Sequence, residues 1–254
     1  MANYDVIGNI VIVKFSRGEK TARKKDWAGK FLKEHKNVKT VLEKSDKIKG
    51  RLRIGKSKFI LGERTKEALY RENGCEFRLN VDTCYFSPRL ASDRLEIAKK
   101  ARNGEKVLVM FSGVGVYGVV IGKNSKALRI VCVELGREPS RYASENVKRN
   151  KVHVEVVQGD VRKKVPLMKE KFDRIVMARP NLKDTFLDVA FSVVKKGGVI
   201  HYHGFYSEDD KSKMLEDIKS EASRAGRKIR ILGVKKIGEI GVRKFRWRVD
   251  LKVG

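Results

Sequence analysis

Short apolar runs alternate with amphipathic stretches from residue 88 onward. The apolar runs, typical of buried strands, span residues 107–111, 130–133, 152–157, 172–177, 199–202, 229–234 and 245–253. The stretches with helical spacing span residues 88–101, 140–150, 185–194 and 211–225, and a glycine loop at 113–118 opens a further helix. Strands that alternate with helices across short turns predict a Rossmann-like α/β fold, with a mostly parallel sheet covered on both faces.

The first part of the chain has a different pattern. Residues 21–36 have helical spacing, and Asn73-Gly74 marks a turn. The short extended or mixed pieces span residues 6–15 (with an early glycine turn), 38–42, 52–61, 65–70 and 75–81. We therefore predict two domains, a small α+β domain at 1–80 and a larger α/β domain at 81–254. A module of this size is marginal alone, so we expect it to pack on the rest.

The charge of the chain narrows the choice of partner. The net charge is +28, from 59 Lys and Arg against 31 Asp and Glu, and the pI is near 10.1. A field of this size attracts polyanions, so it favours RNA, DNA or an anionic membrane surface. The basic residues are interleaved with apolar ones, as on folded surfaces. Adaptation to a salty or hot cell is the alternative, although balanced charge serves that end better.

Compartment can be inferred from what the sequence lacks. No apolar run approaches the length that spans a membrane, and the first residues do not have the pattern of a signal peptide. We therefore expect a cytoplasmic protein without a membrane partner. Cys75, Cys84 and Cys132 show neither pairing nor metal-ligand spacing, which favours a reducing compartment.

Three features with the chemistry of a nucleoside site follow one another along the α/β part. The loop Phe111–Gly115 lies between a predicted strand and a predicted helix, where glycines let the backbone approach a ligand. Glu134 closes the next strand, where a carboxylate can accept hydrogen bonds from two vicinal ribose hydroxyls. Asp160 follows the third strand and can accept from an adenine amine, while Val161 offers its backbone N–H. Dinucleotide binding is the competing use of such a half-fold, but an RNA substrate accounts better for the charge.

Four stretches of the chain resemble one enzyme family. They are Asp82–Arg94 (DTCYFSPRLASDR), Val107–Gly115 (VLVMFSGVG), Asp173–Met177 (DRIVM) and Gly197–His203 (GGVIHYH). In this order they resemble the archaeal–eukaryotic tRNA (guanine-37-N1)-methyltransferases and their relatives, the aminocarboxypropyl transferases of wybutosine synthesis. The resemblance covers nearly the whole chain.

The resemblance implies a class I methyltransferase sheet and S-adenosyl-L-methionine as cofactor. It further implies methyl transfer to N1 of guanine 37, or of a wybutosine-type derivative, in the anticodon stem-loop of tRNA. We expect a monomer without a metal site. The catalytic residues that it implies are Arg89, Arg179 and Pro180. The cofactor-binding residues that it implies are Tyr85, Phe86, Phe111, Gly113, Gly115, Glu134, Leu135, Asp160, Val161 and Ala178.

The two branches of this family both find support. Phe86-Ser-Pro-Arg89 resembles the methyltransferase branch, whereas Glu134 and Tyr202-His203 resemble the aminocarboxypropyl branch. The chain also departs from the family pattern. Val109 stands where the family usually has Asp, Ala178-Arg179-Pro180 replaces Asn-Leu-Pro, and residues 116–133 contain no Asp or Glu. A catalytically impaired, RNA-binding relative is therefore a further alternative.

The resemblance also suggests roles for single side chains. Arg89 near O6 of guanine could stabilise the negative charge that grows as N1 loses its proton, and a helix-surface arginine is the alternative. Arg179 could contact a phosphate or the cofactor carboxylate, or be a solvated surface arginine. His201 and His203 are expected to be core or edge histidines, since two such residues make no metal site.

Overall fold

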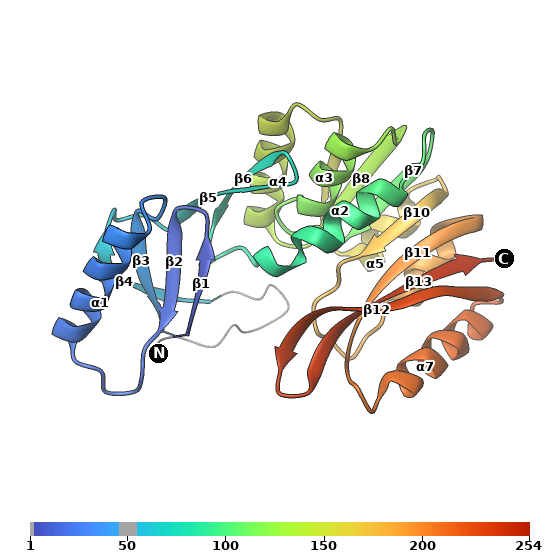
Figure 1. Cartoon of the computed structure of the whole chain (residues 1–254). Coiled ribbons are helices and arrows are strands. Elements are labelled where there is room, and N and C mark those ends of the chain that lie inside the picture. The colour runs from blue at the N-terminus through green and yellow to red at the C-terminus, as the bar shows by residue number, and fades with distance from the viewer. Residues whose placement is uncertain (1–2, 46–54) are drawn as a thin grey trace. The chain divides into compact units, whose positions relative to one another are not determined.

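The computed structural model describes residues 3–45 and 55–254. The chain forms two compact units, Met1–Pro88 and Arg89–Gly254 (Figure 1). The sequence analysis predicted the boundary after residue 80. In the structure it lies after Pro88, so residues 81–88 belong to the first unit. Each unit has its own hydrophobic core.

The first unit is built on a four-stranded sheet in the order β1-β2-β3-β4. Its elements are β1 (Asn3–Ile7), β2 (Ile10–Lys14), α1 (Thr21–Glu34), β3 (Thr40–Lys44) and β4 (Ser57–Gly62). Helix α1 buries Ala28 and Phe31 against Val11, Val13 and Val41 of the sheet. The predicted helix at 21–36 is confirmed. Residues 52–54 of the predicted piece at 52–61 lie outside the described residues.

A glycine splits the strand predicted at 6–15 into the antiparallel pair β1 and β2. Gly8 has a φ of 57°, and a Cβ at this position would lie 1.9 Å from the backbone oxygen of Leu69. Only glycine fits such a close approach to a second chain segment. That segment is the hairpin of β5 (Glu67–Glu72) and β6 (Cys75–Asn80), whose predicted turn at Asn73-Gly74 is confirmed by positive φ at both residues.

The second unit contains a seven-stranded sheet in the order β12-β13-β11-β10-β7-β8-β9. The strands are β7 (Lys106–Met110), β8 (Arg129–Glu134), β9 (Glu155–Gln158), β10 (Phe172–Met177), β11 (Val194–Ser207), β12 (Ile229–Gly241) and β13 (Lys244–Val253). The five strands from β11 to β9 are parallel, and β13 and β12 add an antiparallel edge. The prediction of a mostly parallel sheet is confirmed.

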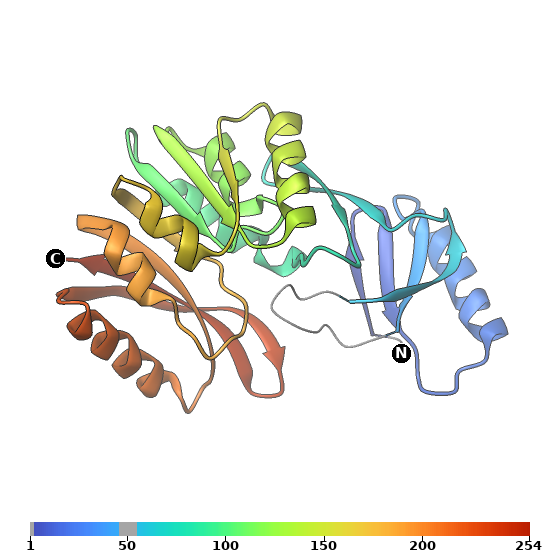
Figure 2. The ribbon, with the colours of Figure 1, turned by 180° about the vertical axis from the view of Figure 1, so that it is seen from behind.

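Helices cover both faces of this sheet. The turn η1 (Pro88–Leu90) and helix α2 (Ala91–Lys100) precede the sheet, and α3 (Val116–Asn124) and α4 (Arg137–Asn150) pack beside α2 on the same face (Figure 1). The short helix α5 (Val161–Lys164), the turn η2 (Val165–Leu167), α6 (Leu187–Val193) and α7 (Lys211–Arg224) cover the other face. These helices pack against the face of the sheet to which Leu108 and Met110 of β7 contribute their side chains (Figure 2).

Two elements differ from the prediction in their length. Gly197-Gly198, expected as a turn before a strand, lies inside β11 at an irregularity of its pairing with β10, where Gly197 has a φ of 76°. Strand β12 continues to Gly241 instead of ending at 234, because it pairs along nearly all of β13. The length of an edge strand depends on the neighbouring strand with which it pairs. The local pattern of hydrophobic residues does not reveal that pairing.

Candidate active site

The predicted nucleoside residues meet at the carboxyl ends of β7, β8 and β9. Backbone hydrogen bonds tie their loops together: Ser112 N donates to Val133 O at 3.1 Å, and Gly159 N donates to Glu134 O at 2.8 Å. In open α/β sheets the crevice outside the carboxyl ends of the strands is where ligands bind. The fold thus brings Gly113, Glu134 and the loop that bears Asp160 to one place.

The backbone conformation of the glycine loop explains why glycine stands at positions 113 and 115. Phe111, Gly113 and Gly115 all have positive φ, of 61°, 56° and 83°. A Cβ on Gly115 would come within 3.1 Å of the Cβ of Ala143 on α4. The loop leads directly into α3, so the first N–H groups of that helix are presented at the crevice.

Gly118 completes a G-x-G-x-x-G spacing with Gly113 and Gly115, but it faces the sheet and not the crevice. A Cβ on Gly118 would lie 2.2 Å from the Sγ of Cys132 on β8. This glycine lets α3 pack closely on the strand, which is the third-glycine role in dinucleotide folds as well. The glycine spacing by itself therefore does not separate the two kinds of cofactor.

Glu134 is held by the backbone on two sides. Its Oε2 accepts from Gly113 N and its Oε1 from Gly136 N, both at 2.8 Å. The residue is only 9% exposed, and it forms no ion pair with any residue in the described parts of the chain. Burial raises the pKa of this carboxyl, and the N–H groups of Gly136, Gly113 and Leu135 lower it only in part.

The chemistry of this carboxylate fits a ribose. A buried carboxylate without a cation is costly unless several donors surround it. Each oxygen of an ionised carboxyl group can accept about two hydrogen bonds, and each oxygen of Glu134 accepts one backbone N–H at 2.8 Å, so each can also accept from one hydroxyl of a vicinal diol. Leu135, which is half-buried, follows at the crevice, where its carbonyl accepts from Gln158 Nε2 at 2.9 Å.

Asp160 caps the short helix α5. Its Oδ1 accepts from Arg162 N at 2.9 Å, and Val161 is buried behind it. The guanidinium of Arg162 forks onto Asp184 at 2.8 Å and onto Asp188 at 2.7 Å. These bonds fasten the Asp160 loop to the segment 178–188 that follows β10.

The aromatic Phe111 borders the same segment. Its ring meets Phe186 edge-on, with 4.9 Å between the centroids, and Arg162 lies 4.9 Å above the ring of Phe186. Phe111 is half-buried, so part of the residue remains accessible to solvent. An aromatic ring in this place can pack against a nucleoside or against the methionine chain of a cofactor.

Arg179 holds the loop after β10 from inside. It is 3% exposed, so the solvated-surface alternative is wrong. Its Nη2 donates to the carbonyls of Leu182 and Asp184, the latter at 2.6 Å, and its guanidinium lies 5.5 Å from the ring of Tyr202. Ala178 and Pro180 on either side are half-buried. A side chain so committed to backbone carbonyls positions its neighbours, and Nε is its remaining unbonded donor among the described residues.

The other predicted residues lie at the unit boundary. Tyr85 and Phe86 belong to the first unit, where Phe86 meets Tyr70 edge-on at 4.8 Å between centroids. Arg89 begins the second unit in the turn η1 before α2, and it is exposed. Their part in transfer and cofactor binding stays a prediction.

A buried polar cluster behind the glycine loop was not predicted. Asp93 of α2 accepts from Tyr117 Oη and from Arg248 Nη1, both at 2.6 Å, and His203 Nε2 lies 3.4 Å away. Burial alone would raise the pKa of Asp93, but His203, Tyr117 and Arg248 hold it well below its ordinary value. His203 and His201 are both buried, as the core alternative expected. The signal in the sequence that could have revealed this cluster is the acidic residue Asp93 on the apolar face of a predicted helix.

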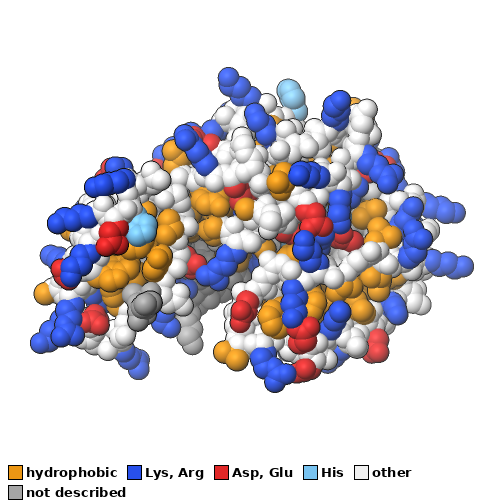
Figure 3. Space-filling view, viewed as in Figure 1, with side chains coloured by type: hydrophobic (Ala, Val, Ile, Leu, Met, Phe, Trp, Pro, Cys, Tyr) orange, Lys and Arg blue, Asp and Glu red, His pale blue; other side chains and the backbone are white. Residues whose placement is uncertain are grey.

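The described residues contain no group of His, Cys, Asp and Glu side chains that could hold a metal ion. In the same described part, no helix is long and apolar enough to cross a membrane. Lys and Arg side chains are spread over the visible surface of both units (Figure 3).

Comparison with known protein families gives two matches. Residues 68–232 match the model of the TRM5/TYW2 methyltransferase domain, and residues 1–65 match the model of the TYW2 N-terminal domain.

Curated relatives share most of the chain. It is 37% identical to the tRNA (guanine(37)-N(1))-methyltransferase Trm5b of Pyrococcus abyssi, over 99% of this chain and 74% of the relative. It is 32% identical to the tRNA (guanine(37)-N(1))/4-demethylwyosine(37)-methyltransferase Taw22 of Nanoarchaeum equitans, over 98% and 99%. It is 29% identical to the tRNA(Phe) (4-demethylwyosine(37)-C(7)) aminocarboxypropyltransferase of Methanocaldococcus jannaschii, over 92% and 91%.

Solved structures show the same fold. The crystal structure of Pyrococcus abyssi Trm5b superposes with a TM-score of 0.88 at 36% identity, covering 99% of this chain and 75% of that one. A complex of aTrm5 with tRNALeu gives 0.85 at 27%, covering 99% and 72%. The TYW2 of Pyrococcus horikoshii in complex with MeSAdo gives 0.83 at 26%, covering 99% and 90%.

Proposed function

This chain belongs to the TRM5/TYW2 methyltransferase family, and on that premise we propose that it methylates N1 of guanine 37, or of a wybutosine-type derivative, in tRNA. The cofactor is S-adenosyl-L-methionine, which supplies an electrophilic methyl group on a sulfonium. The observation that carries the choice of methyl transfer is the 37% identity to a tRNA (guanine(37)-N(1))-methyltransferase over 99% of this chain.

Different residues of the crevice bind different parts of S-adenosyl-L-methionine. Glu134 accepts from the ribose hydroxyls of the cofactor, and Asp160 with the N–H of Val161 takes the adenine edge. Gly113 and Gly115 allow close approach, while Phe111, Leu135 and Ala178 provide apolar contact. Tyr85 and Phe86 add aromatic contact to the cofactor.

Transfer requires that guanine N1 give up its proton as it attacks the methyl group. Arg89 hydrogen-bonds the O6 edge and stabilises the negative charge that spreads to O6. Arg179 and Pro180 shape the loop after β10 that borders the reacting base. Residues 116–133 contain no Asp or Glu, so that segment provides no carboxylate base, and the proton from N1 passes to solvent water.

Aminocarboxypropyl transfer is the second candidate. It is favoured by the match of residues 1–65 to the TYW2 N-terminal domain and by the 29% identity to an aminocarboxypropyltransferase. The same cofactor would then give up its other carbon chain, and methylthioadenosine rather than S-adenosylhomocysteine would be the leaving product.

Two labelled cofactors decide between these functions. The protein is incubated with tRNA and with S-adenosyl-L-methionine that carries the label either on the methyl group or on the carboxyl group. We expect the methyl label to enter position 37. Entry of the carboxyl label instead establishes aminocarboxypropyl transfer, and failure of both labels on every tRNA, with retained RNA affinity, establishes the catalytically impaired alternative.

The partner and setting follow from the same proposal. The anticodon stem-loop of tRNA is the substrate, and the net charge of +28 supports contact with its phosphates. We propose that the protein acts as a cytoplasmic monomer. Sedimentation of the protein alone and with tRNA measures the oligomeric state.

A further inference from the structure

Two adjoining cavities in the second unit play no part in the proposed transfer. Their volumes are about 700 Å³ and 590 Å³, and they share the lining residues Arg102, Arg174, Val199 and Leu232. Arg174 pairs in register with Val107, near the start of β7, and with Val199, where the regular pairing of β11 with β10 begins. The cavities thus lie toward the amino ends of the parallel strands.

That position separates the cavities from the cofactor crevice. The crevice loops follow Met110 and Met177, whereas Arg174 lies four residues before Ala178 along β10. At about 3.3 Å per residue, this is about 13 Å along the strand. A ligand in the cavities would therefore not occupy the cofactor site.

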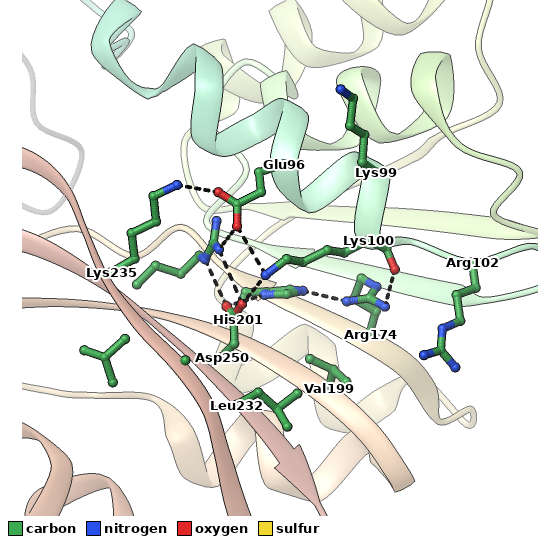
Figure 4. A pocket seen from close by; sticks show the side chains of 13 residues that line it. Glu96, Lys99, Lys100, Arg102, Arg174, Val199, His201, Leu232, Lys235 and Asp250 are labelled. Atoms are coloured by element: carbon green, nitrogen blue, oxygen red, sulfur yellow. Dashed lines mark hydrogen bonds and ion pairs between the residues drawn. The ribbon is translucent and has the colours of Figure 1, made fainter.

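Buried polar side chains build one wall of the larger cavity (Figure 4). Arg174 Nη1 and His201 Nε2 are 2.7 Å apart, and His201 Nδ1 lies 2.7 Å from Asp250 Oδ1. Arg174, His201 and Asp250 are each at most 5% exposed. Glu105 also accepts from Arg174 Nε at 2.8 Å. Such a bonded network keeps the wall rigid, so the site is preformed.

The charge of the cavities is strongly positive. Ten Lys and Arg residues and four Asp and Glu residues line the two cavities. Every one of these four acids is already engaged: Glu96 and Asp250 with Arg248, Glu105 with Arg174, and Asp173 with Lys195. The side chains of five lining cations form no hydrogen bond or ion pair with any residue that the structure describes: Lys99, Arg102, Lys196, Arg230 and Lys252.

The floor of the cavities is partly apolar. Leu232 on the edge strand β12 is 48% exposed, and the half-buried Val199 lies nearby. Uncompensated cations around a concave, partly apolar surface focus a positive potential and attract multivalent anions. Volumes of this size fall in the range of ligand sites, and arginine forks match phosphate oxygens.

We propose that these cavities form a second binding site, for a phosphate-bearing ligand. The phosphate comes either from a free phosphorylated compound or from the backbone of RNA, and both present the same chemistry to Arg102 and Arg230. The site does not depend on the proposed transfer reaction, because it rests on residues outside the crevice.

The test uses the double variant Arg102→Gln/Arg230→Gln, in which two exposed and unpaired cations are made neutral. The matched control is Lys213→Gln/Lys219→Gln, which removes two charges from α7 on the opposite face of the sheet. Inorganic pyrophosphate and tRNA are titrated into all three proteins at several salt concentrations. Affinity for S-adenosyl-L-methionine, equal in the three, shows that the variants are folded.

A free compound is the ligand if the double variant alone binds pyrophosphate at least about tenfold more weakly, since the loss of even one of its two charge-assisted hydrogen bonds has about that effect. The RNA backbone is the ligand if the double variant alone binds tRNA more weakly and its salt slope falls by about two. The proposal is overturned if the double variant matches the control for both probes. Transfer activity is measured separately, so its absence would not affect this result.

Discussion

At the scale of single residues, we expect cofactor binding to depend most on the side chain of Glu134. Glu134→Ala removes an acceptor for both ribose hydroxyls and leaves Gly113 N and Gly136 N without partners. We expect S-adenosyl-L-methionine to bind about 1–3 kcal/mol more weakly, the cost of unpaired buried polar groups. Titration calorimetry measures the change, with Glu216→Ala on the exposed side of α7 as control. Equal affinity in parent and variant would remove Glu134 from the site.

The same carboxyl group predicts a pH dependence. Burial raises the pKa of Glu134, and the ionised form is the one that accepts from both hydroxyls. Cofactor affinity should therefore be full above the raised pKa and should decline as the pH falls through it, above the range of an ordinary glutamate. Glu134→Gln should bind weakly at every pH. A parental affinity that stays constant through mildly acidic pH contradicts this assignment.

Arg89 is expected to matter for transfer more than for binding. A guanidinium at O6 interacts more strongly with the transition state, where charge has developed, than with the ground state. We expect Arg89→Ala to lower the single-turnover rate by about 10²-fold or more, the scale for one preorganised donor, and to leave cofactor affinity nearly unchanged. Arg224→Ala on α7 is the control. A variant that transfers at the parental rate would falsify the role of Arg89.

At the scale of elements, the contact of α3 with β8 depends on a missing side chain. Gly118→Ala would place a Cβ 2.2 Å from Cys132 Sγ, so the helix must shift. Overpacking of this kind costs about 1–3 kcal/mol of unfolding free energy, more than the helix propensity of alanine returns. Urea unfolding of Gly118→Ala, Cys132→Ala and the double variant forms a cycle. We expect Cys132→Ala to relieve much of the effect, and strictly additive changes would show that the contact is not the cause.

The joint of α2 with β13 and α3 rests on buried charge. Asp93→Asn leaves Arg248 with Glu96 and Asp250 as its carboxylate partners, so it should cost about 1–3 kcal/mol, the penalty for weakened buried hydrogen bonds. Because the folded pKa of Asp93 is depressed, its contribution is present above the ordinary aspartate pKa and is lost as the pH falls toward the folded value. Acid unfolding should therefore be less steep in Asp93→Asn than in the parent, and identical profiles would count against this role.

At the scale of the whole molecule, the charge of +28 predicts how tRNA is held. If the protein neutralises six to ten phosphates, affinity should fall by about 10³-fold or more between about 50 and 200 mM salt. Filter binding or fluorescence anisotropy measures this slope. Affinity that stays flat over the same range would contradict a partner held through its backbone.

Much of the architecture could be predicted from the sequence, because it depends on local patterns. The apolar runs gave the strands of the parallel sheet, since strands buried on both faces must be continuously apolar. The order of Phe111–Gly115, Glu134 and Asp160 placed the crevice, because parallel strands put their carboxyl ends on one edge. The early glycine turn expected within residues 6–15 is the turn at Gly8 between β1 and β2, whereas Gly197-Gly198 formed an irregularity inside β11 instead of a turn.

Tertiary structure alone decided which polar side chains are buried together. Asp93 and Arg248 are far apart in the sequence, and Arg174, His201 and Asp250 come from three strands that only the sheet order brings side by side. Burial likewise turned Arg179 from a candidate for surface or phosphate contact into the inner support of the loop after β10. Sequence fixes the type and order of such groups, whereas their solvation and their partners depend on contacts between distant segments, and these set both pKa and role.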